Sequence, residues 1–328
     1  MELQRQRFDE IDIAKGIGIL FVVFGHALKQ IEVDSQVIQD MLLIIHSFHM
    51  PLFFALSGFV SVKIFRLKSK DKPDHIKDRA IRLLTPYFVM SILYLPLKMV
   101  MSSFALRPYD LHSAWRILIG ESPDTTMWFL YILFWCHLIA LLILTKKNLT
   151  WVLIIAFLVS LAAHLFAWPF KIPAYFVFFV FGIFVREHYE GFRALFKWHW
   201  ALIAFVAFAG TQVASILTGH NLSFPVAPFT GTFLVWYIAS LIAGRDGFAK
   251  KTWTLLGSMS MDIYVLSDPI MICLRLVLSG ILGLSVPICI GLFFVLSVIL
   301  AYLASTLVIR RVPLFSLLFL GMRGSSKK

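Results

Sequence analysis

The stretch IDIAKGIGILFVVFGHALK, residues 11 to 29, has the character of a membrane-spanning helix with two ionisable side chains. A bilayer core requires about 20 predominantly apolar residues per helix, and this run has that length. Lys15 lies near one end and His26 two-thirds of the way along. An ionisable side chain at membrane depth is costly and usually faces the interior of a bundle, so the position of His26 indicates a functional residue.

The remainder of the chain has the composition of a polytopic membrane protein. Of the 328 residues, 59 % are hydrophobic and only 15 % are charged, whereas about 25 % charged is usual for soluble domains. The formal net charge of +12 comes from short basic clusters between apolar runs, which indicates topology signals and argues against a nucleic-acid partner. The three cysteines lie in apolar stretches without paired spacing, so we expect neither a disulfide framework nor a metal site.

Apolar runs of roughly spanning length recur along the chain and predict an all-α fold with about ten transmembrane helices. They cover approximately residues 12–30, 41–62, 83–101, 125–144, 150–168, 173–186, 200–218, 228–243, 254–279 and 286–309. Lys and Arg concentrate in alternate connections, which fits ten helices with both termini in the cytoplasm. No small-residue cleavage site follows the first run, so we expect it to be a retained span.

These runs predict one membrane domain over residues 1–309 and a basic cytoplasmic tail over residues 310–328. The tail is too short to span the membrane again, so we expect it to lie along the inner interface. We expect membrane lipids around the helices, while the sequence leaves the oligomeric state open.

Lys15 and His26 project from one face of the first predicted helix. They are eleven residues apart, which is three turns plus about 20° and a rise of about 16 Å. Gly18 and Gly25 lie on the same stripe. The stripe predicts either a closely packed neighbouring helix or a groove for a long ligand. For Lys15 alone, snorkelling to the headgroups is the simpler alternative.

The same stretch, followed by HSFHMPLFFALSGF at residues 46–59, resembles the N-terminal signature of the membrane-bound acyltransferase-3 superfamily. The likeness is greatest to the branch of fucose 4-O-acetylase and related acetyltransferases. That family has a basic residue, ten intervening residues and a histidine in its first helix, and Lys15 and His26 match this spacing. Ser57 and Gly58 match its Ser-Gly element at the end of the second helix.

Further segments of the chain follow the family in order. Arg79 and Arg82 match its Arg-x-x-Arg pair before the third helix, and MWFLYILF, residues 127–134, resembles the start of a later helix. The C-terminal element departs from the pattern, because SMDIYVLSDP, residues 260–269, has Ser267 and Asp268 near the place of an expected histidine. His26 is therefore the main catalytic candidate.

The resemblance implies an enzyme of the bacterial inner membrane that moves an acyl group, usually acetyl, from cytoplasmic acetyl-CoA to a hydroxyl of a cell-surface or lipid-linked glycan. Histidine is suited to proton transfer near neutral pH. His26 would remove the proton of the acceptor hydroxyl or would carry the acetyl group itself, and the sequence does not separate these mechanisms.

The resemblance also implies which residues bind CoA: Lys15, Ser57, Gly58, Arg79 and Arg82. Guanidinium groups form paired, charge-assisted hydrogen bonds with phosphates, which suits the two arginines. The alternative is that the basic residues only set the topology and bind anionic lipid. For Ser57 and Gly58 the alternative is close helix packing.

Other polar side chains at membrane depth are weaker candidates. We expect His49 and Asp268 in acceptor binding, although His49 would equally satisfy a backbone carbonyl freed by Pro51. His137 lies alone on an apolar face, so we expect a packed, hydrogen-bonded structural residue. Asp262 and Asp268 with Arg275 are an alternative intramembrane polar set.

Two other classes of protein compete with the enzyme. A transporter or flippase of a glycan or small metabolite would also bury His, Asp and Arg in its helices. The sequence lacks a corresponding pair of broken helices in two similar halves, which argues against it. A non-catalytic scaffold in a polysaccharide export assembly is the third interpretation.

Overall fold

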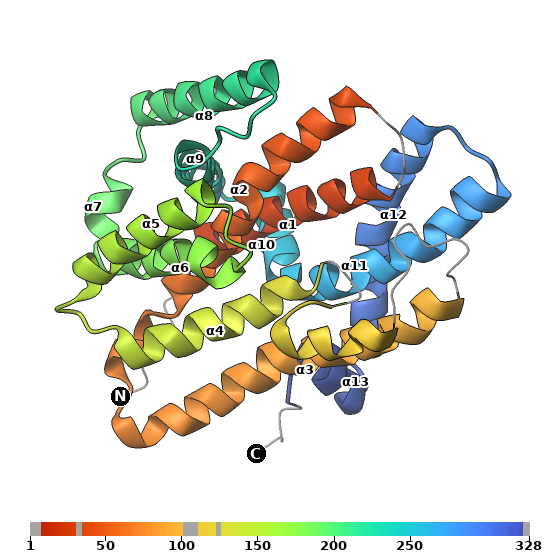
Figure 1. The fold of residues 1–328 in the computed structure, drawn as a ribbon, viewed down its shortest axis with the longest axis horizontal. Coiled ribbons are helices and arrows are strands. Elements are labelled where there is room, and N and C mark those ends of the chain that lie inside the picture. The colour runs from red at the N-terminus through yellow and green to blue at the C-terminus, as the bar shows by residue number, and fades with distance from the viewer. Residues whose placement is uncertain (1–7, 31–34, 101–110, 123–125, 324–328) are drawn as a thin grey trace.

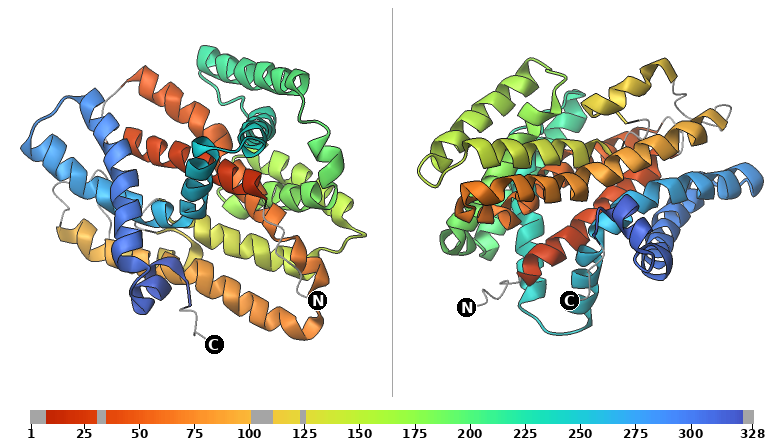
Figure 2. Two further views of the ribbon diagram at one scale, coloured as in Figure 1. Left: turned by 180° about the vertical axis from the view of Figure 1, so that it is seen from behind. Right: turned by 90° about the horizontal axis from the view of Figure 1, so that it is seen from below.

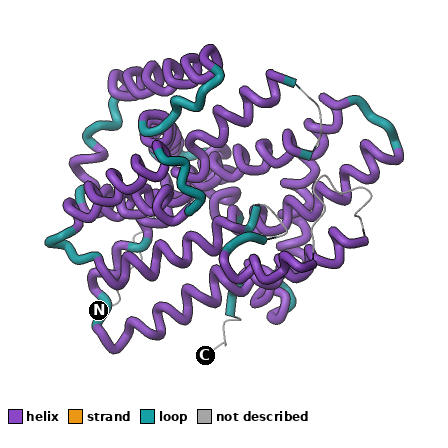
Figure 3. The backbone as a smooth tube through the Cα atoms, viewed as in Figure 1, coloured by secondary structure: helices purple, strands orange, loops and turns teal. Residues whose placement is uncertain are grey.

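The computed structural model describes residues 8–30, 35–100, 111–122 and 126–323, and these form helices and loops without a β-strand. Figure 3 shows that helices make up most of the path of the chain. The prediction of an all-α fold is confirmed.

In the described part of the chain, ten longer helices form the body of the molecule, and Figure 1 shows their arrangement. They are α1 (Asp9–Lys29), α2 (Gln36–Val60), α3 (Lys72–Val100), α4 (Trp128–Ile143), α5 (Leu149–Leu165), α6 (Lys171–Glu187), α8 (Trp198–Thr218), α9 (Val226–Ala243), α11 (Ser260–Arg275) and α12 (Val286–Ala304). The shorter α-helices are α7 (Tyr189–Arg193), α10 (Phe248–Ser258) and α13 (Pro313–Leu320). Each predicted apolar run therefore contains a helix.

The ninth run differs from its prediction, because it is divided between α10 and α11. The break lies at Met259, whose N–H is shared between the carbonyls of Leu255 and Leu256 at 3.1 and 3.2 Å. A shared hydrogen bond of this kind is common where a helix ends.

Six helical segments of the described residues are long and apolar enough to cross a membrane. Each of the six contains one of the helices α1, α2, α8, α9, α11 and α12. The helices α4 and α5 are apolar but shorter. Apolar side chains are exposed along α8, for example Leu202, Phe205 and Val206. A helix that is apolar all round and exposed suits lipid contact, so the fold is that of a polytopic membrane protein. The number of spans stays a prediction.

The helix that carries Lys15 and His26 lies in the interior of the molecule. α1 contacts α2 and α9 as well as α10, α11 and α12, and Figures 1 and 2 show it between these neighbours. Gly18 faces α2, because a Cβ there would lie 3.0 Å from Leu52 and 3.1 Å from Phe53. At Gly18, close helix packing is therefore what the structure shows.

Two other helix contacts depend on glycine. A Cβ at Gly257 of α10 would lie 1.6 Å from the carbonyl oxygen of Asp12 in α1. A Cβ at Gly182 of α6 would lie 1.8 Å from the carbonyl oxygen of Ala55 in α2. Small residues let helix backbones approach closely, so these positions fix α1 on α10 and α2 on α6.

Candidate active site

A cavity of about 290 Å³ lies among α1, α2, α3, α4, α10 and α11. Four of the five side chains expected to bind CoA are on its wall: Lys15, Ser57, Arg79 and Arg82. They come from three helices that are separate in the sequence. The structure thus brings together residues that the sequence could only place at the ends of different helices.

The cavity has a polar, cationic end and an apolar end. Along α1 the wall residues are Asp12, Lys15, Ile19 and Val22, which are three or four positions apart and share one face of the helix. On the adjoining walls, Ser57 of α2 adds a hydroxyl, and Met50, Phe53 and Phe129 add apolar side chains. The wall therefore combines the basic side chains of Lys15, Arg79 and Arg82 with apolar ones.

Lys15 and Arg82 each have a second contact. The Nζ atom of Lys15 lies 3.7 Å from a carboxylate oxygen of Asp12, one turn earlier on α1. The guanidinium of Arg82 donates to the carbonyl oxygen of Leu320, the last residue of α13. A Cβ at Gly321 would lie 2.6 Å from the Cα of Arg82, so α13 is packed tightly onto α3. This part of the predicted tail is folded against the helical body.

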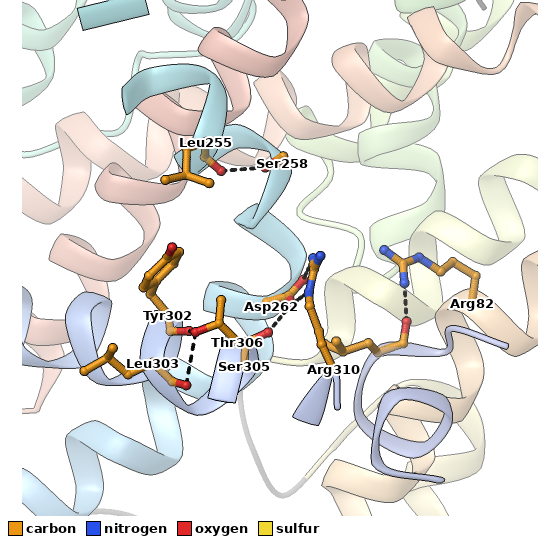
Figure 4. A network of polar contacts seen from close by, with 10 residues as sticks. Arg82, Leu255, Ser258, Asp262, Tyr302, Leu303, Ser305, Thr306 and Arg310 are labelled. Carbon is orange, nitrogen blue, oxygen red and sulfur yellow. Dashed lines mark hydrogen bonds and ion pairs between the residues drawn. The ribbon is translucent and has the colours of Figure 1, made fainter. Parts of the chain in front are cut away.

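A buried ion pair lies next to the cavity. Asp262 is fully buried and accepts hydrogen bonds from Nε and Nη2 of Arg310 at 2.7 and 3.1 Å. The hydroxyl of Ser305 also donates to this carboxylate. Figure 4 shows Asp262 held by these two partners, with Arg82 nearby. The pair anchors the chain after α12 to α11, just beyond the wall residues Ser260 and Met261.

The structure places Gly58 away from the cavity wall. A Cβ at this position would lie 1.9 Å from the carbonyl oxygen of Phe179 in α6. Close packing of α2 on α6 accounts for the glycine, while its neighbour Ser57 lines the cavity.

His26 lies on α1 beyond the apolar end of the cavity and is not part of its wall. It follows the wall residue Val22 by one turn, a rise of about 6 Å. Its side chain is half-buried, and the described residues provide no hydrogen-bond partner for its buried Nδ1 atom. Buried polar atoms are normally hydrogen-bonded, so this nitrogen is suited to a bound group.

Three other basic side chains surround His26. Lys29, His46 and His49 interact with it electrostatically. The rings of His46 and His49 are 5.3 Å apart. The Nδ1–H of His49 donates to the carbonyl oxygen of Ile45 at 2.6 Å. His49 therefore satisfies a carbonyl one turn before it, rather than the one that Pro51 frees.

Asp268 is buried on α11, and its polar partners include Gln30 and Tyr94. Its carboxylate accepts from Nε2 of Gln30 at 3.2 Å and from the hydroxyl of Tyr94 at 2.9 Å. Asp262 pairs with Arg310 instead, so the two aspartates belong to different contacts. No group of three His, Cys, Asp or Glu side chains in the described ranges is arranged to hold a metal ion.

One wall residue was expected to be only structural. His137 of α4 is hydrogen-bonded, as expected, to the carbonyl of Leu133 at 2.8 Å and to Ser61 at 2.9 Å. It also lines the cavity. No spacing in the sequence relates α4 to α2 or α3, so only the fold reveals this position.

Comparison with known proteins provides the remaining evidence. A family model described as an acyltransferase domain matches residues 8–306. The nodulation protein NolL of Mesorhizobium japonicum is 28 % identical over 148 residues, which cover 43 % of this chain and 38 % of that relative. The match thus spans well under half of the relative's length, and no solved structure matches the chain. The particular branch of the family stays a prediction. Because the family model covers nearly all of the 328 residues, the chain belongs to the acyltransferase-3 family.

Proposed function

We propose that this protein transfers an acetyl group from acetyl-CoA to a hydroxyl of a cell-surface or lipid-linked glycan. The observation that carries the proposal is the single stripe on α1 that runs from Lys15 along Ile19 and Val22 to His26. Acetyl-CoA has phosphates at one end and a long uncharged arm that ends in the thioester. This distribution of charge matches a cavity that is cationic at Lys15 and apolar towards His26.

The cationic end of the cavity would bind the phosphates of CoA. Arg79 and Arg82 present guanidinium groups from one face of α3, and Lys15 faces them from α1. Such groups form short, charge-assisted hydrogen bonds with phosphate oxygens. Ser57 adds a hydroxyl on the adjacent wall.

His26 would act on the acetyl group or on the acceptor hydroxyl. A sugar hydroxyl is a poor nucleophile until a base takes its proton, and one positioned base contributes about 10²- to 10⁴-fold in rate. The Nδ1 atom of His26, which has no hydrogen-bond partner among the described residues, would take that proton. The same nitrogen could carry the acetyl group before transfer, and His49 and Asp268 would then contact the acceptor.

The central experiment measures transfer of labelled acetyl from acetyl-CoA to glycan by the purified protein. His26→Gln keeps a polar side chain of similar reach but cannot titrate, so we expect loss of transfer with retained CoA binding. His164→Gln is the matched control, because His164 stacks on Phe224 at 3.8 Å and is not a cavity residue. Normal turnover by a folded His26→Gln protein would remove His26 from the mechanism.

A second experiment tests the CoA site. Replacing Arg79 with Ala should weaken acetyl-CoA binding by about tenfold or more, the effect of losing one charge-assisted hydrogen bond of about 1.5–3 kcal/mol. Lys147→Ala is the control, because Lys147 is an exposed basic residue outside the cavity. If Arg79→Ala and Lys147→Ala bind acetyl-CoA with equal affinity, Arg79 does not bind the donor and only sets the membrane topology.

The proposal also requires that the cationic end faces the cytoplasm, where acetyl-CoA is made available. Reporter fusions at residues 70 and 248 should therefore both be cytoplasmic, and a fusion at residue 113 should be external. An external signal at residue 70 would contradict this orientation and with it the placement of the donor.

A further inference from the structure

Three contacts join His137, Ser61 and two backbone carbonyls, and they need more protons than a neutral imidazole and one hydroxyl provide. His137 Nδ1 lies 2.8 Å from the carbonyl oxygen of Leu133, and Nε2 lies 2.9 Å from the hydroxyl oxygen of Ser61. That hydroxyl also lies 2.7 Å from the carbonyl oxygen of Ser57. Carbonyl oxygens only accept hydrogen bonds, so Nδ1 must donate to Leu133 and Ser61 must donate to Ser57.

The number of available protons decides whether all of these hydrogen bonds can form at once. With both donations in place, the contact between Nε2 and Ser61 needs a proton on Nε2, because the single hydroxyl proton of Ser61 is already used. Three contacts therefore require three protons. A neutral imidazole and one hydroxyl provide two, whereas an imidazolium provides the third.

The surroundings of His137 decide when that third proton is present. Arg79 and His75 of α3 and Lys63 of the 3₁₀ helix η1 (Val62–Arg66) interact with the imidazole electrostatically. From α6 the ring of Phe179 packs on it at 4.6 Å. His137 is buried, and these charged neighbours are all basic, so burial and repulsion both disfavour a positive imidazole unless a negative charge is close by.

His137 lies on the wall of the cavity that also contains Arg79, Lys15 and Arg82. An anionic group in this cavity would offset the repulsion and favour the state in which all three hydrogen bonds form. We propose that His137 takes up one proton when a phosphate-bearing acyl donor enters the cavity, and that Ser61 locks the protonated ring in place.

The proton moves in a defined way. It comes from solvent to Nε2, which then donates to the hydroxyl oxygen of Ser61. The hydroxyl proton of Ser61 turns to the carbonyl of Ser57, and Nδ1–H stays on the carbonyl of Leu133. No bond to the donor forms or breaks, and the added charge lies beside its phosphates.

This inference rests on the proposed function, because it deepens the donor site of the same cavity. It assigns a preference among donors: a thioester with phosphates should recruit the proton, and the bare pantetheine arm should not. It also makes binding dependent on pH. In the pH range where free His137 is neutral, each unit of decrease in pH should tighten CoA binding by up to tenfold.

The experiment is calorimetric titration of the purified full chain with CoA in two buffers of different ionisation enthalpy. The difference in measured heat gives the number of protons taken up, which we expect to approach one for wild-type protein. Pantetheine is the second probe, with an expected uptake near zero. His137→Gln should bind CoA more weakly and lose the uptake, and Ser61→Ala should reduce the uptake without changing the cavity cations.

His75 is the main alternative source of proton uptake. It is partly exposed, and burial together with Arg79 and Lys63 lowers its pKa from the ordinary value. His75→Gln is therefore the matched control and should keep the uptake that His137→Gln loses. Comparing variants also cancels any protonation of the CoA phosphates themselves.

The possible results separate the two proposals. CoA binding without proton uptake, or with uptake that His137→Gln retains, would overturn the role of His137 and leave the donor site intact. Failure of wild-type protein to bind CoA at all would overturn the proposed function and this inference with it.

Discussion

Removing either partner of the ion pair between Asp262 and Arg310 should destabilise the protein, but by different amounts. The Asp262 side chain is 0 % exposed and that of Arg310 is 35 % exposed. Arg310→Met leaves a buried carboxylate, and the hydrogen-bond donor that stays with it among the described residues is the Ser305 hydroxyl. Breaking a buried pair in this way costs about 3–5 kcal/mol.

Asp262→Asn instead leaves the charge of Arg310 without its partner. Because the Arg310 side chain is one-third exposed, it regains hydrogen bonds from water. We expect a cost of about 1–2 kcal/mol, in the range of a lost hydrogen bond to a charged group. The double variant should cost less than the sum of the single variants, because it leaves neither charge without a partner.

The assay is reversible unfolding in mixed micelles as the fraction of denaturing detergent rises. The nine tryptophans provide a fluorescence signal, and the free energies of unfolding of the two variants are compared. An equal or larger cost for Asp262→Asn would refute the argument from exposure.

Two further predictions concern helix packing. Gly182→Leu should destabilise the protein by at least about 1–3 kcal/mol, because a Cβ there meets the Ala55 carbonyl oxygen at 1.8 Å. The measurement is thermal unfolding. Gly291→Ala is the control, because nothing lies within 4 Å of its new Cβ. Arg82→Ala should speed proteolytic cleavage within α13 by removing its bond to Leu320, whereas Arg79→Ala should not, and equal cleavage of the two variants would contradict this role of Arg82.

The helices were predictable because their signal is local. Twenty or so apolar residues in a row suffice to indicate a spanning helix, and each predicted run contains one. The break at Met259 was not predictable in the same way, since it lies beside the contact of Gly257 with α1, which no local pattern indicates. That contact joins residues more than 200 positions apart.

The candidate site was predictable only in part, and for a similar reason. Resemblance to the family selected Lys15, Arg79 and Arg82, but their common cavity follows from the arrangement of three helices. No motif surrounds His137 in the sequence, and its interest as a candidate comes from its hydrogen bond with Ser61, 76 residues away. Likewise, Asp262 could not be assigned to Arg310, which lies beyond the next helix.

The contact of α1 with α10 and α11 also has a consequence for biosynthesis. α1 is complete at Lys29, whereas α10 begins at Phe248. At about 5–20 residues per second, the ribosome needs about 10–40 s to make the intervening chain. Throughout that time the cavity lacks the wall that Gly257, Ser260 and Tyr264 provide. An unfinished nascent chain therefore has α1 in place before the cavity beside it can close.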